Sequence, residues 1–202
     1  MPPFLLVATR TEVILFAVQS NELVLITTLP TEFDSSAIAL WTQQQQDGAC
    51  TGLIVAVAQW VTNTLTLYQV TDGGHQWEGE GTTTVLFDQT YSSCIYDLAM
   101  VSLSSSSPSS STSEEMMEEG KDKENLFLMI SHIDGSVRIL SSSSSSSATT
   151  TIGHSWKEEK YFHVCAYPGR WVLSSNPSSV LLAGHRPCML YQKNTSWLYV
   201  TQ

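Results

Sequence analysis

The sequence predicts an all-β chain made of β-propeller blades, and three observations lead to this prediction. A two-strand pattern recurs four times along the 202 residues. It returns after about fifty residues, as from Leu5 to Leu53 and from Leu126 to Val180, which is the spacing of four-stranded propeller blades. The apolar runs are rich in β-branched residues and lack the 3.6-residue period of a helix.

Each copy of the pattern is an apolar run, a short polar break and a second apolar or alternating run, as expected of a hairpin. The four copies cover residues 5–18, 53–70, 126–140 and 180–191. The third contains Asp134-Gly135, which favours a tight turn because glycine tolerates positive φ. The stretches 37–41, 85–87 and 95–103 are the predicted remaining strands. We interpret Asp72-Gly73-Gly74 as a looser connection between two blades.

Two low-complexity inserts interrupt the pattern, at residues 104–124 and 141–155. The first combines serines with acidic residues and the second is a serine and threonine tract, so neither has the apolar surface that would offset the entropy of ordering. We expect both to be dispensable surface loops. Residues 1–202 then form one partial propeller of about three to four blades, which is part of a larger propeller because closed rings have ~4 to 8. Its terminal blades should leave strand edges and apolar faces open.

The net charge and the first twelve residues argue against a protein that binds nucleic acid directly, spans a membrane or is secreted. The chain has 19 acidic and 9 basic residues, and the basic residues do not cluster, which argues against direct contact with nucleic acid. The apolar run at residues 4–8 is too short for a membrane helix and is followed by Arg10 and Glu12, which spoil a secretory signal. We therefore expect no membrane association and a cytoplasmic or nuclear location.

A search for chemistry finds no converging set of reactive side chains. The five histidines show no ligand spacing among themselves: His75, His132, His154, His163 and His185. The cysteines are too far apart for zinc or redox pairs, and we expect free buried thiols at Cys50, Cys94, Cys165 and Cys188. His163 and Cys165 share a strand face but lack a third orienting group, so we interpret them as a structural pair.

The sequence also lacks a glycine-rich phosphate loop, a nucleophile elbow and paired carboxylates. We predict a protein that is not an enzyme, with no catalytic, cofactor-binding or metal-binding residue and no cofactor. The alternative left open is a propeller enzyme with a central active site. The six tryptophans are spread along the chain, which favours packing between blades, with some of them as interface anchors.

The fourth hairpin and the strand after it show a family resemblance. Residues 180–191 read VLLAGHRPCMLY and residues 197–200 read WLYV. This pattern resembles the second propeller of the damaged-DNA-binding protein large subunit, where an apolar strand, a small residue and Arg-Pro precede an apolar strand ending in Tyr. Residues 5–25, 53–70 and 126–140 agree with that family in the same order, and the Trp60-Val61-Thr62 stretch is among the closest parts. The family has an acidic residue before the arginine, and this chain has His185.

The resemblance implies a non-catalytic protein-interaction scaffold in the nucleus, with the cytoplasm as a second location. Its closest branch implies a propeller that docks a cullin scaffold in a ubiquitin ligase adaptor of the DNA damage response. The same superfamily includes the large subunit of the cleavage and polyadenylation specificity factor and a propeller subunit of splicing factor 3b. The alternative is therefore the equivalent propeller of an RNA-processing complex, with nucleic acid binding. No partner contact follows for Arg186 and Pro187, which we interpret as hairpin structure.

Overall fold

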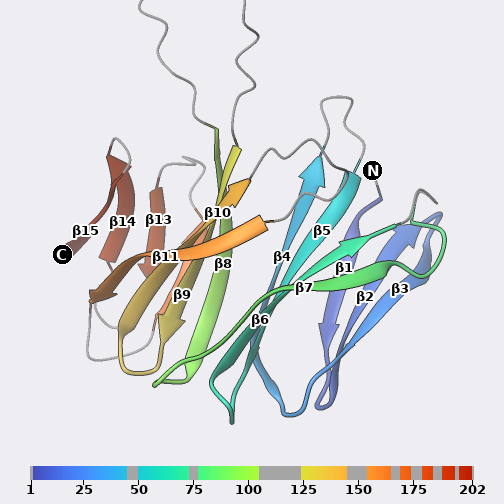
Figure 1. Ribbon diagram of the computed structural model, residues 1–202, viewed down its shortest axis with the longest axis horizontal. Helices are drawn as coiled ribbons and strands as arrows, with labels where there is room; N and C mark the ends of the chain where they lie inside the picture. Colours follow the sequence, from blue (N-terminus) through green and yellow to red (C-terminus); the bar gives the residue numbers. More distant parts are fainter. Residues whose placement is uncertain are drawn as a thin grey trace, which may run out of the picture.

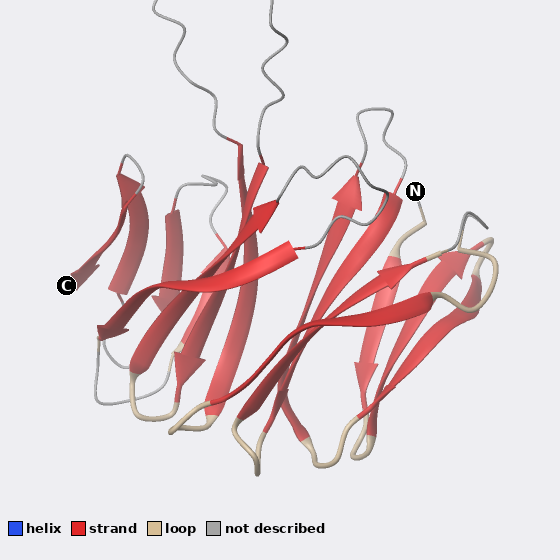
Figure 2. Ribbon diagram, viewed as in Figure 1, coloured by secondary structure: helices blue, strands red, loops and turns tan. Residues whose placement is uncertain are grey.

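The computed structural model describes residues 2–44, 50–72, 77–104, 124–144, 154–164, 169–173, 179–183, 188–193 and 196–201. All the regular structure in these ranges is β-strand (Figure 2). Within them there is no helix long and apolar enough to span a bilayer. Four antiparallel sheets stand side by side in chain order, with sheet 1 at one end and sheet 4 at the other (Figure 1).

Every strand pairs with the next strand along the chain, within its own sheet. Sheet 1 has three strands, β1 (Phe4–Ala8), β2 (Glu12–Gln19) and β3 (Glu22–Pro30). Sheet 2 has β4 (Ser35–Gln44), β5 (Cys50–Gln59), β6 (Thr64–Thr71) and β7 (Thr82–Thr90). Sheet 3 has β8 (Ile95–Ser104), β9 (Glu124–His132), β10 (Ser136–Ser144) and β11 (His154–His163). Sheet 4 has β12 (Arg170–Leu173), β13 (Ser179–Ala183), β14 (Cys188–Lys193) and β15 (Ser196–Thr201).

The four predicted hairpins are confirmed as β1–β2, β5–β6, β9–β10 and β13–β14. In sheets 2 to 4 the hairpin supplies the two middle strands. The predicted stretches 37–41, 85–87 and 95–103 lie in β4, β7 and β8. In sheets 2 and 3 the apolar hairpins are therefore the strands paired on both sides and the most buried ones, whereas β1 is an edge strand of sheet 1.

The core consists of three apolar layers, each between consecutive sheets. The layer between sheets 1 and 2 includes Val13, Leu15, Ala17, Leu53, Val55 and Val57. The layer between sheets 2 and 3 includes Ile54, Ala56, Ala58, Leu126, Leu128 and Ile130. The layer between sheets 3 and 4 includes Phe127, Met129, Leu182, Leu190 and Trp197. Alternate residues of β5 and of β9 enter different layers, so these strands are buried on both faces, which explains their continuous apolar sequences.

One repeated hydrogen bond shows which strands correspond between sheets 1, 2 and 3. The residue after the last strand donates its N–H to a carbonyl in the hairpin turn of the same sheet. The bonds join Thr31 N to Thr11 O (2.9 Å), Tyr91 N to Asn63 O (3.0 Å) and Val164 N to Gly135 O (3.1 Å). The strands β1, β2 and β3 are therefore equivalent to β5, β6 and β7. Sheet 1 lacks the first strand, the counterpart of β4 and β8, which lie beside each other.

The predicted limits of the second insert are wrong. Residues 141–144 belong to β10 and residues 154–155 to β11, although both segments were assigned to an insert at 141–155. Main-chain pairing explains the difference, because Ser142 lies between Leu126 of β9 and Trp156 of β11. For the insert at 104–124, the end residues Ser104 and Glu124 are also strand residues. The loop prediction for 105–123 and 145–153 lies outside the described residues.

The connection predicted at Asp72-Gly73-Gly74 is also wrong in one respect. It follows β6 and leads to β7, and these two strands pair with each other in sheet 2, with Thr71 opposite Thr82. The segment therefore joins strands within one blade, not two blades. A glycine pair indicates a change of direction, but it does not indicate which strand comes next. Gly73 and Gly74 themselves lie outside the described residues.

Candidate protein-interaction surface

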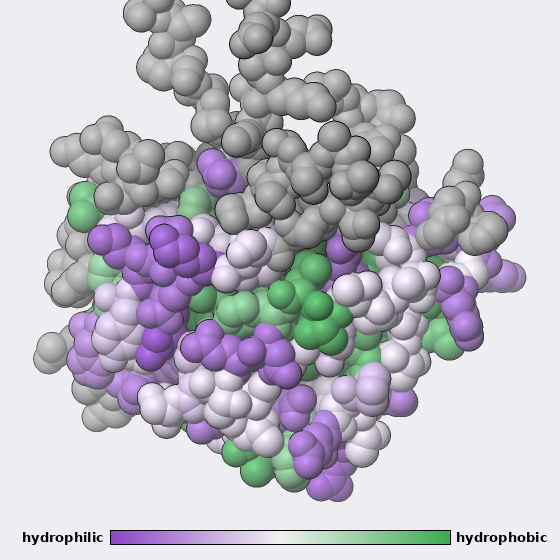
Figure 3. All heavy atoms as spheres, viewed as in Figure 1, coloured by the Kyte–Doolittle hydropathy of each residue, from purple (hydrophilic) through white to green (hydrophobic). Residues whose placement is uncertain are grey.

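The hairpin turns of sheets 1, 2 and 3 lie at one end of the molecule, the lower end in Figure 1. Large apolar side chains stand in two of these turns. Trp60 and Val61 in the β5–β6 turn are 49% and 62% exposed, and Ile133 in the β9–β10 turn is 37% exposed. We call these three residues the turn-end patch. Apolar atoms reach the surface at this end in Figure 3.

The segment before β8 holds the two turns together. The Ile133 N–H donates to the Cys94 carbonyl (2.9 Å), and Cys94 Sγ donates to the Trp60 carbonyl (3.5 Å). The Trp60 N–H donates to the Asp34 carbonyl (2.9 Å). These bonds use main-chain atoms of Trp60 and Ile133, so they fix the backbone from which both exposed side chains extend.

The cysteines are less buried than predicted. Cys50 and Cys94 are free, as expected, but only half-buried. Burial raises the pKa of the Cys94 thiol, which keeps it protonated and able to donate to Trp60 at neutral pH. Burial likewise raises the pKa of Cys50. Cys165 and the side chain of Cys188 lie outside the described residues.

The β9–β10 turn is the tight turn that Asp134-Gly135 predicts. Gly135 has a φ of 79°, which glycine adopts without strain. Asp134 Oδ1 accepts hydrogen bonds from Ser136 N (2.9 Å) and Ser136 Oγ (2.7 Å). Partial burial alone would raise the pKa of Asp134, but these two hydrogen bonds outweigh it and the pKa is lowered. The turn therefore presents Ile133 from a fixed loop next to a carboxylate that is charged at neutral pH.

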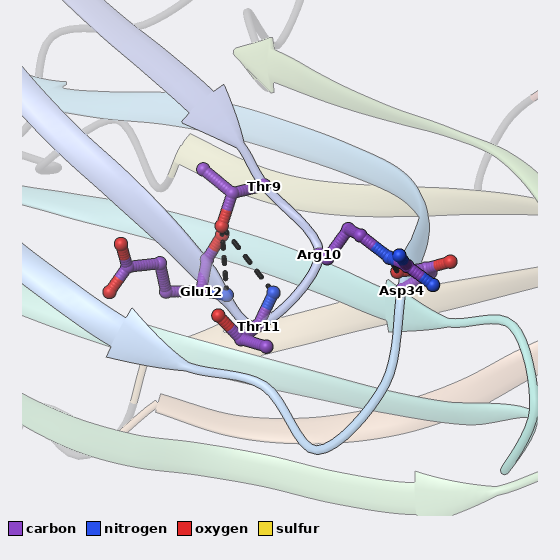
Figure 4. Close-up of polar contacts among 5 residues, drawn as sticks. All are labelled: Thr9, Arg10, Thr11, Glu12 and Asp34. Atoms are coloured by element: carbon purple, nitrogen blue, oxygen red, sulfur yellow. Dashed lines mark hydrogen bonds and ion pairs between the residues drawn. The ribbon is translucent and has the colours of Figure 1, made fainter.

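The polar β1–β2 turn borders the patch through Asp34, and Figure 4 shows the contacts of this turn. Thr9 Oγ1 accepts hydrogen bonds from Glu12 N (3.2 Å) and Thr11 N (3.4 Å), which fixes the turn. Arg10 Nε then lies 3.5 Å from Asp34 Oδ1, and both side chains are exposed. A solvated pair of this kind contributes little to stability. Because the Asp34 carbonyl accepts the Trp60 N–H, the pair lies directly beside the patch.

A second polar cluster lies between sheets 2 and 3. The Arg138 guanidinium stacks 5.1 Å from the Tyr91 ring centre and 4.7 Å from the Tyr161 ring centre, and it pairs with Glu158. His132 Nδ1 donates to the Ser93 carbonyl (3.0 Å), so Nδ1 bears the proton in the neutral ring. Burial lowers the pKa of His132 and raises that of Tyr91, so both are neutral at pH 7.

This cluster has the chemistry of a structural joint. Tyr91 Oη and His132 Nε2 are buried, and neither has a hydrogen-bond partner among the described residues. The His132 ring meets the Tyr91 ring edge to face at 5.2 Å between centres, so neither group is placed as a base beside a nucleophile. The arrangement secures Arg138 between two rings and ties the β9–β10 hairpin to the segment before β8.

The other histidines named in the sequence analysis are not brought together. His163 is exposed at the end of β11, whereas His75, His185, Cys165 and the side chain of His154 lie outside the described residues. The proposed pairing of His163 with Cys165 is therefore untested. Among the described residues, no three His, Cys, Asp or Glu side chains form a group suited to a metal ion. The absence of a metal, a cofactor and catalysis stays a prediction.

Five of the six tryptophans pack in or against the layers between sheets, as the sequence predicts. Trp77, Trp156 and Trp197 are buried in the layers between sheets or beside them, and Trp41 and Trp171 are half-buried against those layers. Trp60 alone of the six is exposed. A local signal marks it, because Trp-Val stands in a hairpin turn where polar residues are usual. Sequence reasoning missed Ile133 as a surface residue.

Comparisons with known proteins support the fold. No family profile matches the sequence, and no curated protein matches it. Among solved structures the chain is similar to the WD40 domain of SCAP from fission yeast, with a TM-score of 0.55 and 12% sequence identity over 94% of this chain and 36% of that one. At this identity the likeness shows the fold alone. It confirms the predicted all-β propeller architecture, and the chain spans about a third of the length of its structural neighbour.

Proposed function

We propose that this chain is a non-catalytic scaffold that binds another protein through the turn-end patch. The observation that supports this most strongly is the exposure of Trp60, Val61 and Ile133, which two neighbouring sheets bring to one end. Contiguous exposed apolar surface marks interaction sites in soluble proteins, and tryptophan is enriched among the residues that dominate binding energy. The hydrogen bonds of the Cys94 carbonyl and thiol to Ile133 and Trp60 fix the backbone of the patch before binding, which lowers the entropic cost of association.

The charge around the patch indicates the kind of partner. The chain has a formal net charge of -10, and Asp134 stands next to Ile133 in the patch, whereas the Asp34 carboxylate is paired with Arg10. A negative field accelerates encounters with basic surfaces and repels a phosphate backbone. The partner we propose is therefore a protein with an apolar centre and a basic rim.

The test compares Trp60→Ala with a matched control at an exposed valine away from the patch, Val85→Ala on β7. Partners recovered by the wild-type chain are identified, purified and titrated against both variants. We expect Trp60→Ala to weaken binding by roughly 30-fold, the effect of losing a hot-spot residue of about 2 kcal/mol, and Val85→Ala to bind as the wild type does. If the wild type and both variants bound with equal affinity, the turn-end patch would not be the binding site.

Within this scaffold role we propose the cullin-docking propeller of a nuclear ubiquitin ligase adaptor in the DNA damage response. The support is the resemblance at residues 180–191 and 197–200, together with Trp60-Val61-Thr62, which includes two residues of the patch. A purified cullin scaffold should bind the chain at micromolar concentration and lose that binding with Trp60→Ala. Binding to subunits of an RNA-processing complex or to RNA, with none to the cullin, would favour the alternative branch. A fluorescent fusion of the chain tests the nuclear location.

A further inference from the structure

Sheet 1 has an apolar face that no other sheet of the described residues covers. Leu5 and Val7 of β1 are 41% and 36% exposed. In the sheet register Leu5 lies opposite Phe16 and Val7 opposite Ile14, so these side chains share one face. The neighbouring residues Val13, Leu15 and Ala17 of β2 point to the other face, into the layer shared with sheet 2.

The equivalent face is buried in sheets 2 and 3. Sheets 1 and 2 can be aligned on the turn carbonyls of Thr11 and Asn63, which accept the repeated hydrogen bond described above. Ile14 and Thr66 each lie three residues after that carbonyl, so they are equivalent. Their partners in the register, Val7 and Val57, are therefore equivalent as well. By the same alignment Leu5 corresponds to Val55 of sheet 2 and to Leu128 of sheet 3. Val55, Val57 and Leu128 are all 0% exposed, because the preceding sheet covers them. We call this side of each sheet its back face and the opposite side its front face.

Exposed side chains on the outer strands do not indicate a missing neighbouring sheet. Leu25 on β3 is exposed, but so is its counterpart Val85 on β7, although sheet 1 covers the back face of sheet 2. Exposure at the outer strand is therefore common to sheets 1 and 2, whether or not another sheet covers the back face. In sheet 1, it is the exposure of Leu5 and Val7 that indicates a missing sheet on the back face.

Sheet 4 has the complementary opening. Val172 of β12 is 48% exposed, whereas Trp171 beside it packs toward sheet 3. Val172 therefore lies on the front face. On the corresponding strand of sheet 3, the front-face residues Ala99 and Val101 are buried against sheet 4. Among the described side chains, Leu5 and Val7 thus mark an open back face of sheet 1, and Val172 marks an open front face of sheet 4.

We propose that a second copy of this chain covers both open faces. All three layers within the chain are formed by a front face packed on the back face of the next sheet. The front face of sheet 4 in one copy would pack in the same way on the back face of sheet 1 in the other, at two symmetric places. Two copies of four sheets give a ring of eight sheets, within the range of ~4 to 8 known for closed propellers. Head-to-tail contacts of this kind close into a ring when the rotation is complete.

Charge gives the association a characteristic salt dependence. Each copy has a formal net charge of -10, so the copies repel each other over long distances. The side chains that meet on the faces are aliphatic, and added salt screens the repulsion without weakening their contact. The dimer should therefore become tighter between low and moderate salt, opposite to the behaviour of an interface based on ion pairs.

The experiment measures the mass of the 202-residue chain by light scattering over a range of concentrations. The ring predicts a limiting mass of twice 22.3 kDa. Leu5→Glu blocks the back face and Val172→Glu blocks the front face, so each variant alone should be a monomer. Mixed together, they should form a dimer with one intact joint, which dissociates at least roughly ten-fold more readily than the wild type. Leu25→Glu is the control on the same sheet and should dimerise normally.

Each other result would overturn the proposal. A wild-type chain that stays monomeric at about 100 µM, well above the dissociation constants of specific dimers, has no such joint. A mass that keeps rising with concentration indicates an open polymer. Dimerisation of Val172→Glu by itself, with Leu5→Glu monomeric, indicates back faces packed on each other. The wild-type mass alone remains decisive should a variant fail to fold, and Val7→Lys repeats the back-face test.

Discussion

Val7 on β1 and Val57 on β5 occupy equivalent positions in equivalent hairpins, yet Val7 is 36% exposed and Val57 is 0% exposed. The residue type and the strand geometry are the same. The difference lies in what covers them, since sheet 1 packs on Val57, whereas none of the four described sheets packs on Val7. Each blade therefore has a sequence suited to two neighbours, and in the inner sheets those neighbours are present. Apolar residues hold the fold together where the chain supplies the next sheet, and they stay partly exposed where the described chain supplies none.

The largest expected effect on stability comes from truncating a leucine in a covered sheet, and the equivalent leucine of the open sheet is the comparison. Leu128→Ala removes a fully buried side chain from the layer between sheets 2 and 3 and should lower the free energy of unfolding by about 3 kcal/mol. Leu5→Ala at the equivalent position of sheet 1 should cost less than about 1 kcal/mol. Urea denaturation at a concentration where the chain is monomeric measures both. Equal losses would mean that the two positions do not differ in the way the fold requires.

A smaller loss of stability is expected at Gly81, where the main chains of sheets 1 and 2 are in contact. The Gly81 N–H donates to the Ile26 carbonyl (2.8 Å), and a Cβ at Gly81 would lie 2.9 Å from Val70 Cγ1 and 3.1 Å from Thr71 O. Gly81→Ala should therefore destabilise the chain by about 1–3 kcal/mol, because the layer has no room for a methyl group. Gly79→Ala is the control, since nothing lies within 4 Å of its Cβ. Thermal unfolding measures the stability of both variants. If Gly81→Ala were as stable as the wild type, sheets 1 and 2 would pack more loosely than the structure indicates.

The joint between sheets 2 and 3 should make stability depend on pH. Burial lowers the pKa of His132 below its unfolded value near 6.5. As the pH falls below 6.5 the unfolded chain binds this proton before the folded chain does, so stability is lost down to the folded pKa. His132→Asn should flatten this part of the profile of unfolding free energy between pH 5 and 8. An unchanged slope would show that His132 is not the group responsible.

The smallest effect is expected at the border of the turn-end patch. Arg10 and Asp34 form an exposed pair 3.5 Å apart, and Arg10→Ala should change the free energy of unfolding by less than about 0.5 kcal/mol. Its effect on partner binding should appear mainly in the association rate and in the salt dependence. Stopped-flow mixing with the identified partner at two ionic strengths measures this. A large loss of stability would mean that the pair is part of the fold and not of the border.

The hairpins were predictable from sequence because burial of a strand on both faces requires a continuous apolar run, and turns such as Asp134-Gly135 mark the ends of these runs. The outer strand β11 was not predicted. Most of its residues are exposed, as in Lys157 and Glu158, so it lacks an alternating pattern. The serines of β10 were missed because main-chain pairing needs no apolar side chain.

The candidate site was predictable only in part. Trp60 stands out in the sequence as an aromatic residue in a turn, but its nearness to Ile133 depends on Cys94, a residue from a third segment. The open back face was beyond local reasoning, because Leu5 and Leu128 belong to the same pattern and differ only in their neighbours. Sequence shows which side chains prefer to be buried, and only the arrangement of sheets shows which of them are.

Hydrogen exchange of the whole chain, measured at low and at high protein concentration, tests the difference between covered and open sheets most directly. At low concentration we expect amides of β1 to exchange at least about ten-fold faster than those of β5 and β9, which open only with global unfolding. At high concentration protection should rise in β1, β2 and β12 and stay unchanged in β5 and β9. Equal protection of β1 and β5 in the dilute chain, or protection that does not respond to concentration, would contradict the account.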